Sequence, residues 1–183
     1  MASVIIPLAQ GCEEIEAVTV IDLLRRAGIE VITAGLDDQP VTASRGTRLL
    51  ADVTLDAALR RDYDMVVLPG GQPGADNLDQ DVRIRDLLQR MSLQGKYTAA
   101  ICAAPKVLAS AGVLAGKRAT GFPGVLEKLT LDNVQLSTRA VVTDGKVITS
   151  RGPGTAMDFA LELIELLVGK DKRVQVEAAL QRP

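Results

Sequence analysis

The chain contains no histidine among its 183 residues. Without an imidazole, no Ser–His–Asp triad, Cys–His dyad or histidine metal ligand can form. Any general base must therefore be Asp, Glu, Lys, Tyr or a thiolate. Tryptophan is also absent and aromatic residues make up only 2% of the chain, which argues against stacking surfaces for single-stranded nucleic acid.

Cysteine is scarce as well, since only Cys12 and Cys102 are present. Two cysteines are too few for a disulfide framework or a structural zinc site. The N-terminus lacks the basic flank of a signal peptide, and no apolar run is long enough to span a bilayer. The formal net charge of −2 marks no nucleic-acid or membrane surface. We therefore expect a soluble cytoplasmic protein with neither of these partners.

Strand-length apolar segments alternate with helical ones, which favours an α/β fold with a largely parallel sheet and helices on both faces. We expect one domain over residues 1–183. The pattern predicts main strands at 3–9, 30–34, 65–68 and 97–101, short added strands near 41–43 and 48–53, a hairpin turning at Asp144-Gly145, and helices at 13–27, 55–60, 81–94, 105–111, 155–168 and 172–180. Pro7 cannot donate to a sheet ladder, so the first strand is expected to be distorted.

The segment around Cys102 contains the strongest chemical signal. A short apolar strand ends at Ile101, and Pro105 is placed to open a helix. A side chain on such a turn projects from the carboxyl end of a sheet, as in a nucleophile elbow. The N-terminus of the following helix would favour a thiolate and lower the pKa of Cys102. The segment alone leaves a second interpretation open, a small cysteine packed in the core.

Glu16 lies in the first turn of the first predicted helix, at the margin of its apolar stripe. A carboxyl that is shielded from water is disfavoured in its charged form, so its pKa should rise. A carboxyl of raised pKa near a thiol is a plausible acid and base partner. The alternative is a surface acid that complements the helix dipole, which suits Glu13 and Glu14 better.

Other loop residues give weaker signals. The glycines after the strand at 65–68 offer backbone N–H groups to an anion, or simply form a tight turn. Arg45 and Arg151 either hold a carboxylate or are solvated side chains. Cys12 precedes two glutamates that discourage its ionisation, so we interpret it as a bystander. A Cys12–Cys102 disulfide remains open if the two loops are neighbours.

Four motifs together resemble the ThiJ/PfpI superfamily, and within it the branch of the parkinsonism-associated deglycase and its YajL relatives. They are GCEEIE at 11–16, LPGG at 68–71, AAICAAP at 99–105 and TSRGPGT at 149–155. The resemblance runs in order over nearly the whole chain. It implies a flavodoxin-like three-layer sandwich and a homodimer, with the exposed face of the first helix used in the dimer contact.

The resemblance also implies roles for individual residues. Cys102 is expected to be the nucleophile and oxidation sensor, and Glu16 the acid bonded to its sulfur. Gly71 and Ala103 are expected to donate their N–H groups to an oxyanion. In the substrate pocket the resemblance places Arg45, with Arg26 entering from the partner subunit, while Arg151 and Phe122 are further candidates. Relatives often carry a histidine where this chain has Phe122, so either Glu16 transfers protons alone or the activity is weak.

These expectations give two hypotheses for the function. The first is a glyoxalase or deglycase that needs no cofactor or metal and acts on glyoxal, methylglyoxal or their early adducts with proteins and nucleotides. The second is a non-catalytic redox sensor and oxidative-stress chaperone that binds misfolded proteins. Both depend on the same residues, so the sequence does not separate them. Proteolysis is disfavoured because no histidine completes a triad.

Overall fold

The computed structural model describes residues 1–182, and Pro183 lies outside the described residues. Its main sheet has seven strands in the order β10-β11-β7-β6-β1-β2-β5. These are β1 (Ser3–Leu8), β2 (Glu30–Gly35), β5 (Val53–Thr54), β6 (Met65–Leu68), β7 (Tyr97–Ile101), β10 (Val141–Asp144) and β11 (Val147–Ser150). All neighbours pair in parallel except β10 with β11. The predicted largely parallel sheet is therefore confirmed.

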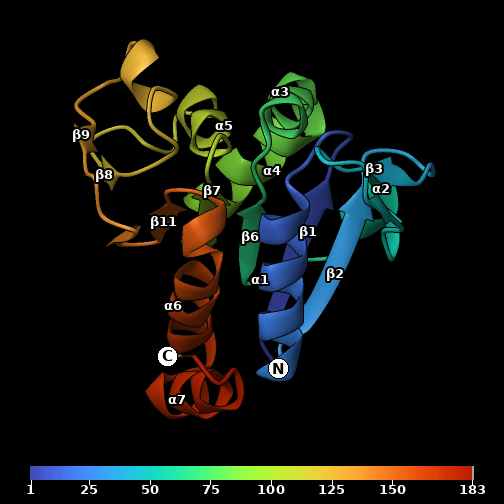
Figure 1. Ribbon diagram of the computed structural model, residues 1–183. Helices are drawn as coiled ribbons and strands as arrows, with labels where there is room; N and C mark the ends of the chain where they lie inside the picture. Colours follow the sequence, from blue (N-terminus) through green and yellow to red (C-terminus); the bar gives the residue numbers. More distant parts are fainter. Residues whose placement is uncertain (183) are drawn as a thin grey trace.

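Helices cover both faces of this sheet (Figure 1), as the α/β pattern predicts. They are α1 (Glu14–Arg26), α2 (Leu55–Ala58), α3 (Gln72–Gln80), α4 (Val82–Leu93), α5 (Pro105–Ser110), α6 (Ala156–Val168) and α7 (Lys170–Ala179), with 3₁₀ turns at Leu126–Lys128 and Pro153–Thr155. Helices α1 and α6 pack together on one face, while α4 and α5 contact each other and β7 on the other. No helix within residues 1–182 is long and apolar enough to cross a membrane.

Two small strand pairs lie outside the main sheet. Strands β3 (Val41–Thr42) and β4 (Arg48–Leu49) pair antiparallel, where short added strands were predicted. Strands β8 (Arg118–Ala119) and β9 (Gln135–Leu136) pair in parallel and were not predicted. A segment of only two residues carries too little periodicity to be recognised as a strand.

Pro7 does not distort β1, so that expectation was wrong. Strand β1 pairs with β2 without interruption from Ser3 to Leu8. Its pairing with β6 ends earlier, at Ile5 opposite Val66. The backbone of Ser3 bonds to Asp64 on the β6 side, so alternate residues, including Pro7, also face that side. Pro7 thus lies where no ladder donor is needed.

Helix α3 was missed by the sequence analysis, which treated residues 69–74 as a loop and began the next helix at residue 81. Gly71 precedes the helix with φ 81°, and Pro73 lies in its first turn. Gly74 marks a close approach rather than a turn, because a Cβ there would lie 2.6 Å from Cys12 Cα. A glycine and a proline usually indicate a loop, but here they mark the start of a helix.

The segment around Thr155 also differs from expectation. The helix predicted from residue 155 begins at Ala156, and the side chain of Thr155 bonds to no backbone N–H of α6. Its Oγ1 instead accepts from Gly152 N at 3.1 Å and contacts Ser150 Oγ at 2.7 Å. Thr155 therefore fixes the loop between β11 and α6. The β10–β11 hairpin is confirmed, although its turn comprises Gly145 and Lys146, one residue beyond the predicted position.

Asp52 offers a test of what holds the edge of the sheet. Its Oδ2 accepts from the N–H and hydroxyl of Thr33 at 2.9 and 2.8 Å and from Arg25 at 2.7 Å. We expect Asp52→Ala to lower the free energy of unfolding by about 2 kcal/mol in urea titrations, because the N–H of buried Thr33 loses its acceptor. As a control, Asp22→Ala removes only an exposed Asp22–Arg26 pair and should cost less than about 0.5 kcal/mol. Equal losses would contradict this role of Asp52.

Candidate active site

Three loops meet at the carboxyl edge of the sheet. They are 10–16 after β1, 69–74 after β6 and 102–105 after β7. The first two are joined directly, since Glu13 N donates to Gly70 O at 3.0 Å. The chain leaves β1 toward β2 on one side and returns to β6 on the other, which makes a topological switch point. Ligands of open α/β sheets bind in the crevice at such a point.

Cys102 occupies a strained turn at the end of β7. Its φ of 64° is left-handed, a conformation that residues with a side chain seldom adopt. Two hydrogen bonds hold it: Cys102 N donates to Ser150 O at 2.9 Å, and Phe122 N donates to Cys102 O at 2.8 Å. The side chain is 8% exposed, so the sulfur remains accessible from one side. This geometry is the nucleophile elbow that the sequence predicts.

Glu16 is completely buried beside this turn, at 0% exposure. Its Oε2 accepts from Gly70 N at 2.8 Å, and Oε1 has no conventional hydrogen-bond partner within residues 1–182. Burial raises the pKa of Glu16 to about 7, against the opposing effects of the Cys102 thiol and the Gly70 N–H. The predicted rise in the pKa is thus reproduced, and it arises from desolvation.

The expected low pKa of Cys102 is not reproduced. Burial and the charge of the Glu16 carboxylate raise the pKa of the thiol to about 12, and N–H groups from Gly71 and Ala103 offset only part of this. The two acids titrate as a pair, because a negative charge on either disfavours ionisation of the other. The pair therefore carries at most one negative charge at neutral pH. A thiolate forms most readily when the remaining proton resides on Glu16.

Two backbone N–H groups converge on the sulfur from different elements. Gly71 donates from the residue before α3, and Ala103 from the turn before α5. The two helices are tied together by an ion pair between Lys106 of α5 and Asp76 of α3. The spacing of the donors is thereby fixed. Such preorganised donors stabilise a thiolate or an oxyanion formed next to it.

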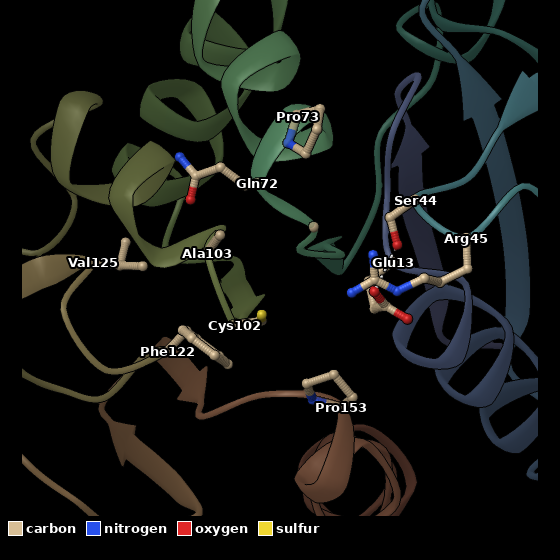
Figure 2. A pocket seen from close by; sticks show the side chains of 11 residues that line it. Glu13, Ser44, Arg45, Gln72, Pro73, Cys102, Ala103, Phe122, Val125 and Pro153 are labelled. Atoms are coloured by element: carbon tan, nitrogen blue, oxygen red, sulfur yellow. Dashed lines mark hydrogen bonds between the residues drawn. The ribbon is translucent and has the colours of Figure 1, made fainter.

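Gly71, Cys102 and Ala103 lie at a cavity of about 330 Å³ (Figure 2), and Glu16 is buried behind them. The lining residues of the cavity are Glu13, Ser44, Arg45, Gly71, Gln72, Pro73, Cys102, Ala103, Phe122, Val125 and Pro153. Within residues 1–182, no cluster of three or more His, Cys, Asp or Glu side chains is arranged to hold a metal ion.

Comparison with known proteins agrees with this arrangement. Residues 2–166 match the DJ-1/PfpI family. The chain belongs to this family.

Several members of the DJ-1/PfpI family are similar over nearly the whole chain. The Drosophila melanogaster protein dj-1beta is 42% identical over 179 residues, which is 97% of this chain and 96% of that protein. The crystal structure of Drosophila DJ-1beta superposes with a TM-score of 0.95 at 41% identity, covering 100% of this chain and 98% of that one. The glutathione-independent glyoxalase DJR-1.2 of Caenorhabditis elegans is 37% identical over 163 residues, 89% of this chain and 87% of that protein.

Some DJ-1/PfpI relatives are longer than this chain. The Arabidopsis thaliana protein DJ-1 homolog B is 43% identical over 178 residues, 96% of this chain but only 40% of that protein. The chain thus spans less than half the length of that relative.

Not every predicted pocket residue of this DJ-1/PfpI chain lines the cavity. Arg45 and Phe122 do, whereas Arg26 and Arg151 do not. Arg26 ends α1 and pairs with Asp22 at 2.7 Å, about 15 Å along the helix from Glu16. Its expected contribution from a partner subunit remains a prediction. Arg151 does not line the cavity, whereas Pro153, two residues further along the chain, does.

The sequence analysis missed six lining residues. Glu13, taken as a surface acid, is 8% exposed and accepts from Ser44 Oγ at 2.7 Å. Ser44 comes from the β3–β4 connection, which no local signal placed at the site. Val125 comes from a turn and Pro153 from the 3₁₀ turn before α6, while Gln72 and Pro73 open the helix that was not predicted. Their proximity depends on tertiary folding alone.

Cys12 is a free thiol with 0% exposure, and Cys102 is also unpaired, so the disulfide that remained open from the sequence is not formed. Burial, followed by the charge of Glu14, raises the pKa of Cys12 to about 11. The sequence analysis gave the correct direction from the neighbouring glutamates but missed burial as the larger cause.

The charge limit on the Glu16–Cys102 pair predicts a pH-dependent stability. The pKa of Glu16 rises from 4.5 to about 7 on folding, so the folded state binds more protons in this range and stability falls as the pH rises through it. We expect the wild type to lose about 3 kcal/mol of unfolding free energy relative to Glu16→Gln between pH 4 and pH 8. Urea titrations at both pH values measure this.

Glu14→Gln is the matched control, because the backbone N–H and Ser44 bonds that outweigh desolvation hold the pKa of Glu14 at about 2. Glu14 therefore stabilises the fold above its unfolded pKa, and this contribution is lost only as the pH falls from 4.5 toward 2. Its variant should follow the wild-type profile between pH 5 and pH 8. Parallel profiles for wild type and Glu16→Gln would contradict the assignment.

Proposed function

We propose that this protein is a cofactor-independent glyoxalase that converts 2-oxoaldehydes such as methylglyoxal and glyoxal into 2-hydroxy acids. The observation that carries the proposal is a thiol on a strained turn, with two backbone donors at its sulfur and a buried carboxyl of pKa about 7 beside it. The name of the C. elegans relative, a glutathione-independent glyoxalase, supports the same reaction class.

The reaction begins with attack by the Cys102 thiolate on the aldehyde carbon, which forms a carbon–sulfur bond and an alkoxide. Glu16 holds the proton of the pair at this stage and donates it to the alkoxide, giving a hemithioacetal. The N–H groups of Gly71 and Ala103 stabilise the negative oxygen that forms on the carbon bonded to the sulfur.

Glu16 is now a carboxylate and acts as the base. It removes the proton from the former aldehyde carbon and returns it to the neighbouring carbon. The hydroxyl of the hemithioacetal gives its own proton to the neighbouring carbonyl oxygen, so that this carbonyl becomes a hydroxyl. The first carbon is oxidised to a thioester and the second is reduced, so no external electron acceptor is required. Water then cleaves the thioester and releases the hydroxy acid and the thiol. Overall, methylglyoxal and one water give lactic acid.

The same chemistry extends to deglycation. The adduct of a 2-oxoaldehyde with a protein or nucleotide amine is a hemiaminal that retains the reactive carbon next to a carbonyl. Loss of the amine returns the aldehyde to the Cys102 sulfur, after which the steps are identical. A cavity open to solvent on one side suits such a substrate, because the amine carrier remains outside.

We expect Cys102→Ser to abolish formation of lactate from methylglyoxal, because the hydroxyl cannot ionise in this site. Glu16→Asp should lower kcat about 100-fold, since its shorter side chain draws the carboxyl away from the reacting carbons. Cys12→Ser, a matched cysteine outside the cavity, should remain within about twofold of wild type. Purified, reduced and metal-free protein is assayed by enzymatic detection of lactate. Full activity in Cys102→Ser or Glu16→Asp would remove that residue from the mechanism.

A second candidate function is redox sensing coupled to an oxidative-stress chaperone activity toward misfolded proteins. The difference in exposure between the two free thiols favours it, because Cys102 is reachable at 8% exposure whereas Cys12 is fully buried. A peroxide would oxidise the Cys102 thiolate to a sulfenic and then a sulfinic acid, each step transferring one oxygen atom and releasing water or hydroxide. Protonated Glu16 would donate to the sulfinate.

Intact mass spectrometry after mild peroxide treatment tests this function. We expect a gain of two oxygen atoms on Cys102 in the wild type and in Cys12→Ser, and none in Cys102→Ser. Oxidation confined to Cys12 would overturn the sensor hypothesis. The experiment is independent of turnover and therefore separates the two functions.

We also propose that the chain forms a homodimer through α1. Two large apolar side chains on this helix, Ile15 and Val18, are 55% and 46% exposed. Neither belongs to the buried stripe of Ala17, Val20 and Leu24 that packs on the core. A second copy of the chain would cover this face near the first turn of α1, which also holds Glu16.

A further inference from the structure

The cavity above Cys102 has two chemically different sides (Figure 2). Glu13, Ser44 and Arg45 form one side, which is polar and contains both charges. Phe122 and Val125 lie on the other side, which also holds the amide side chain of Gln72, and Pro153 lies below the sulfur. We call Phe122, Val125 and Pro153 the apolar wall. The sulfur of Cys102 lies between the two sides. A substrate held at the sulfur therefore meets a polar and an apolar surface at once.

Phe122 is fixed relative to the nucleophile. Its N–H donates to the carbonyl of Cys102 at 2.8 Å, and its carbonyl accepts from Val125 N at 3.1 Å. Its ring lies against Gly152, where an added Cβ would be 3.4 Å from Cδ2 of the ring. The backbone bonds thus hold two members of the apolar wall in a constant position beside the reacting sulfur.

The ring nevertheless has a free face, since Phe122 is 49% exposed. An exposed aromatic surface inside a cavity gains free energy when an apolar group covers it. Exposed apolar side chains scattered on a surface need no explanation, but this one lines the cavity together with Val125 and Pro153. A ligand that lies against the Phe122 ring would bury this exposed face.

The cavity is also larger than the smallest substrates need. Its volume of about 330 Å³ compares with roughly 30 Å³ for one water molecule in the liquid. Glyoxal and methylglyoxal have four and five non-hydrogen atoms, so they leave most of this space to solvent.

We propose that the apolar wall makes the site selective for 2-oxoaldehydes whose ketone carbon bears a bulky apolar substituent, an aryl or branched alkyl group, which lies against Phe122. This inference rests on the proposed function and specifies its substrate class. The aldehyde carbon bonds to Cys102, and the substituent begins two atoms further on. The substituent is therefore close enough to contact Phe122, whose N–H is bonded to the Cys102 carbonyl.

The test compares kcat/KM for glyoxal, methylglyoxal and phenylglyoxal in the wild type, Phe122→Ala and Leu129→Ala. Leu129 is the matched control, an apolar residue of the same segment, 40% exposed and outside the cavity lining. We expect the wild type to favour phenylglyoxal over glyoxal by about tenfold or more. Phe122→Ala should remove most of this preference, and Phe122→Leu should restore part of it. Because 2-oxoaldehydes also react with arginine side chains, intact mass spectra are used to check the protein for such adducts.

A binding measurement keeps the inference testable without turnover. The product acids glycolate, lactate and mandelate carry hydrogen, methyl and phenyl substituents, and their affinities are obtained by calorimetry. Mandelate should bind about tenfold more tightly than lactate to the wild type and Leu129→Ala, but not to Phe122→Ala. If no dicarbonyl is turned over while this Phe122-dependent preference persists, the proposed function fails and the selectivity stands. Equal affinities in wild type and Phe122→Ala overturn the selectivity whatever the turnover.

Discussion

The burial of one carboxyl and one thiol against each other governs this site. Neither Glu16 nor Cys102 has enough water to support its charge, and each charge opposes the other. The contact also dictates the backbone around it. A Cβ at Gly70 would lie 2.6 Å from Cys102 Cβ and 2.7 Å from Glu16 Oε2, so only glycine allows the two acids to meet there. Gly70 therefore acts in two ways. Its lack of a side chain leaves room for the Glu16 carboxyl, and its N–H donates to that carboxyl.

The rest of the fold maintains a conformation that Cys102 would not adopt alone. A left-handed residue with a side chain costs on the order of 1–3 kcal/mol. The N–H and carbonyl of Cys102 are bonded to Ser150 of β11 and to Phe122, so relaxation of the turn would break both bonds. Strand β7 lies between β6 and β11 inside the sheet, which leaves its end little freedom to move. Rigidity at the nucleophile is thus a property of the sheet rather than of the loop.

The sequence predicts those parts of the site that depend on local signals. Cys102 and Glu16 each lie at a strand-to-helix junction, and the amphipathic pattern of α1 indicates that Glu16 lies at the margin of its buried face. Gly71 and Ala103 follow from their positions in the motifs. Val125, Pro153 and Ser44 could not be predicted, because they reach the cavity through connections whose course depends on tertiary packing. Helix α3 was missed for a different reason, since Gly74 is required for contact with Cys12 and only resembles a turn signal.

The pKa of Cys102 shows why knowledge of the residues is not sufficient. The sequence suggests a helix terminus that favours a thiolate, but α5 comprises only Pro105–Ser110, and burial beside Glu16 acts in the opposite direction. A histidine at position 122 would add a cation or a proton donor to this balance, whereas Phe122 adds neither. Stabilisation of the anion then depends on the N–H groups of Gly71 and Ala103, and proton transfer depends on Glu16. In the proposed mechanism, attack by sulfur requires the pair to keep a proton on Glu16, and the next step requires Glu16 to have donated that proton. The two proposed steps are therefore ordered by a single proton, and neither of them requires an imidazole.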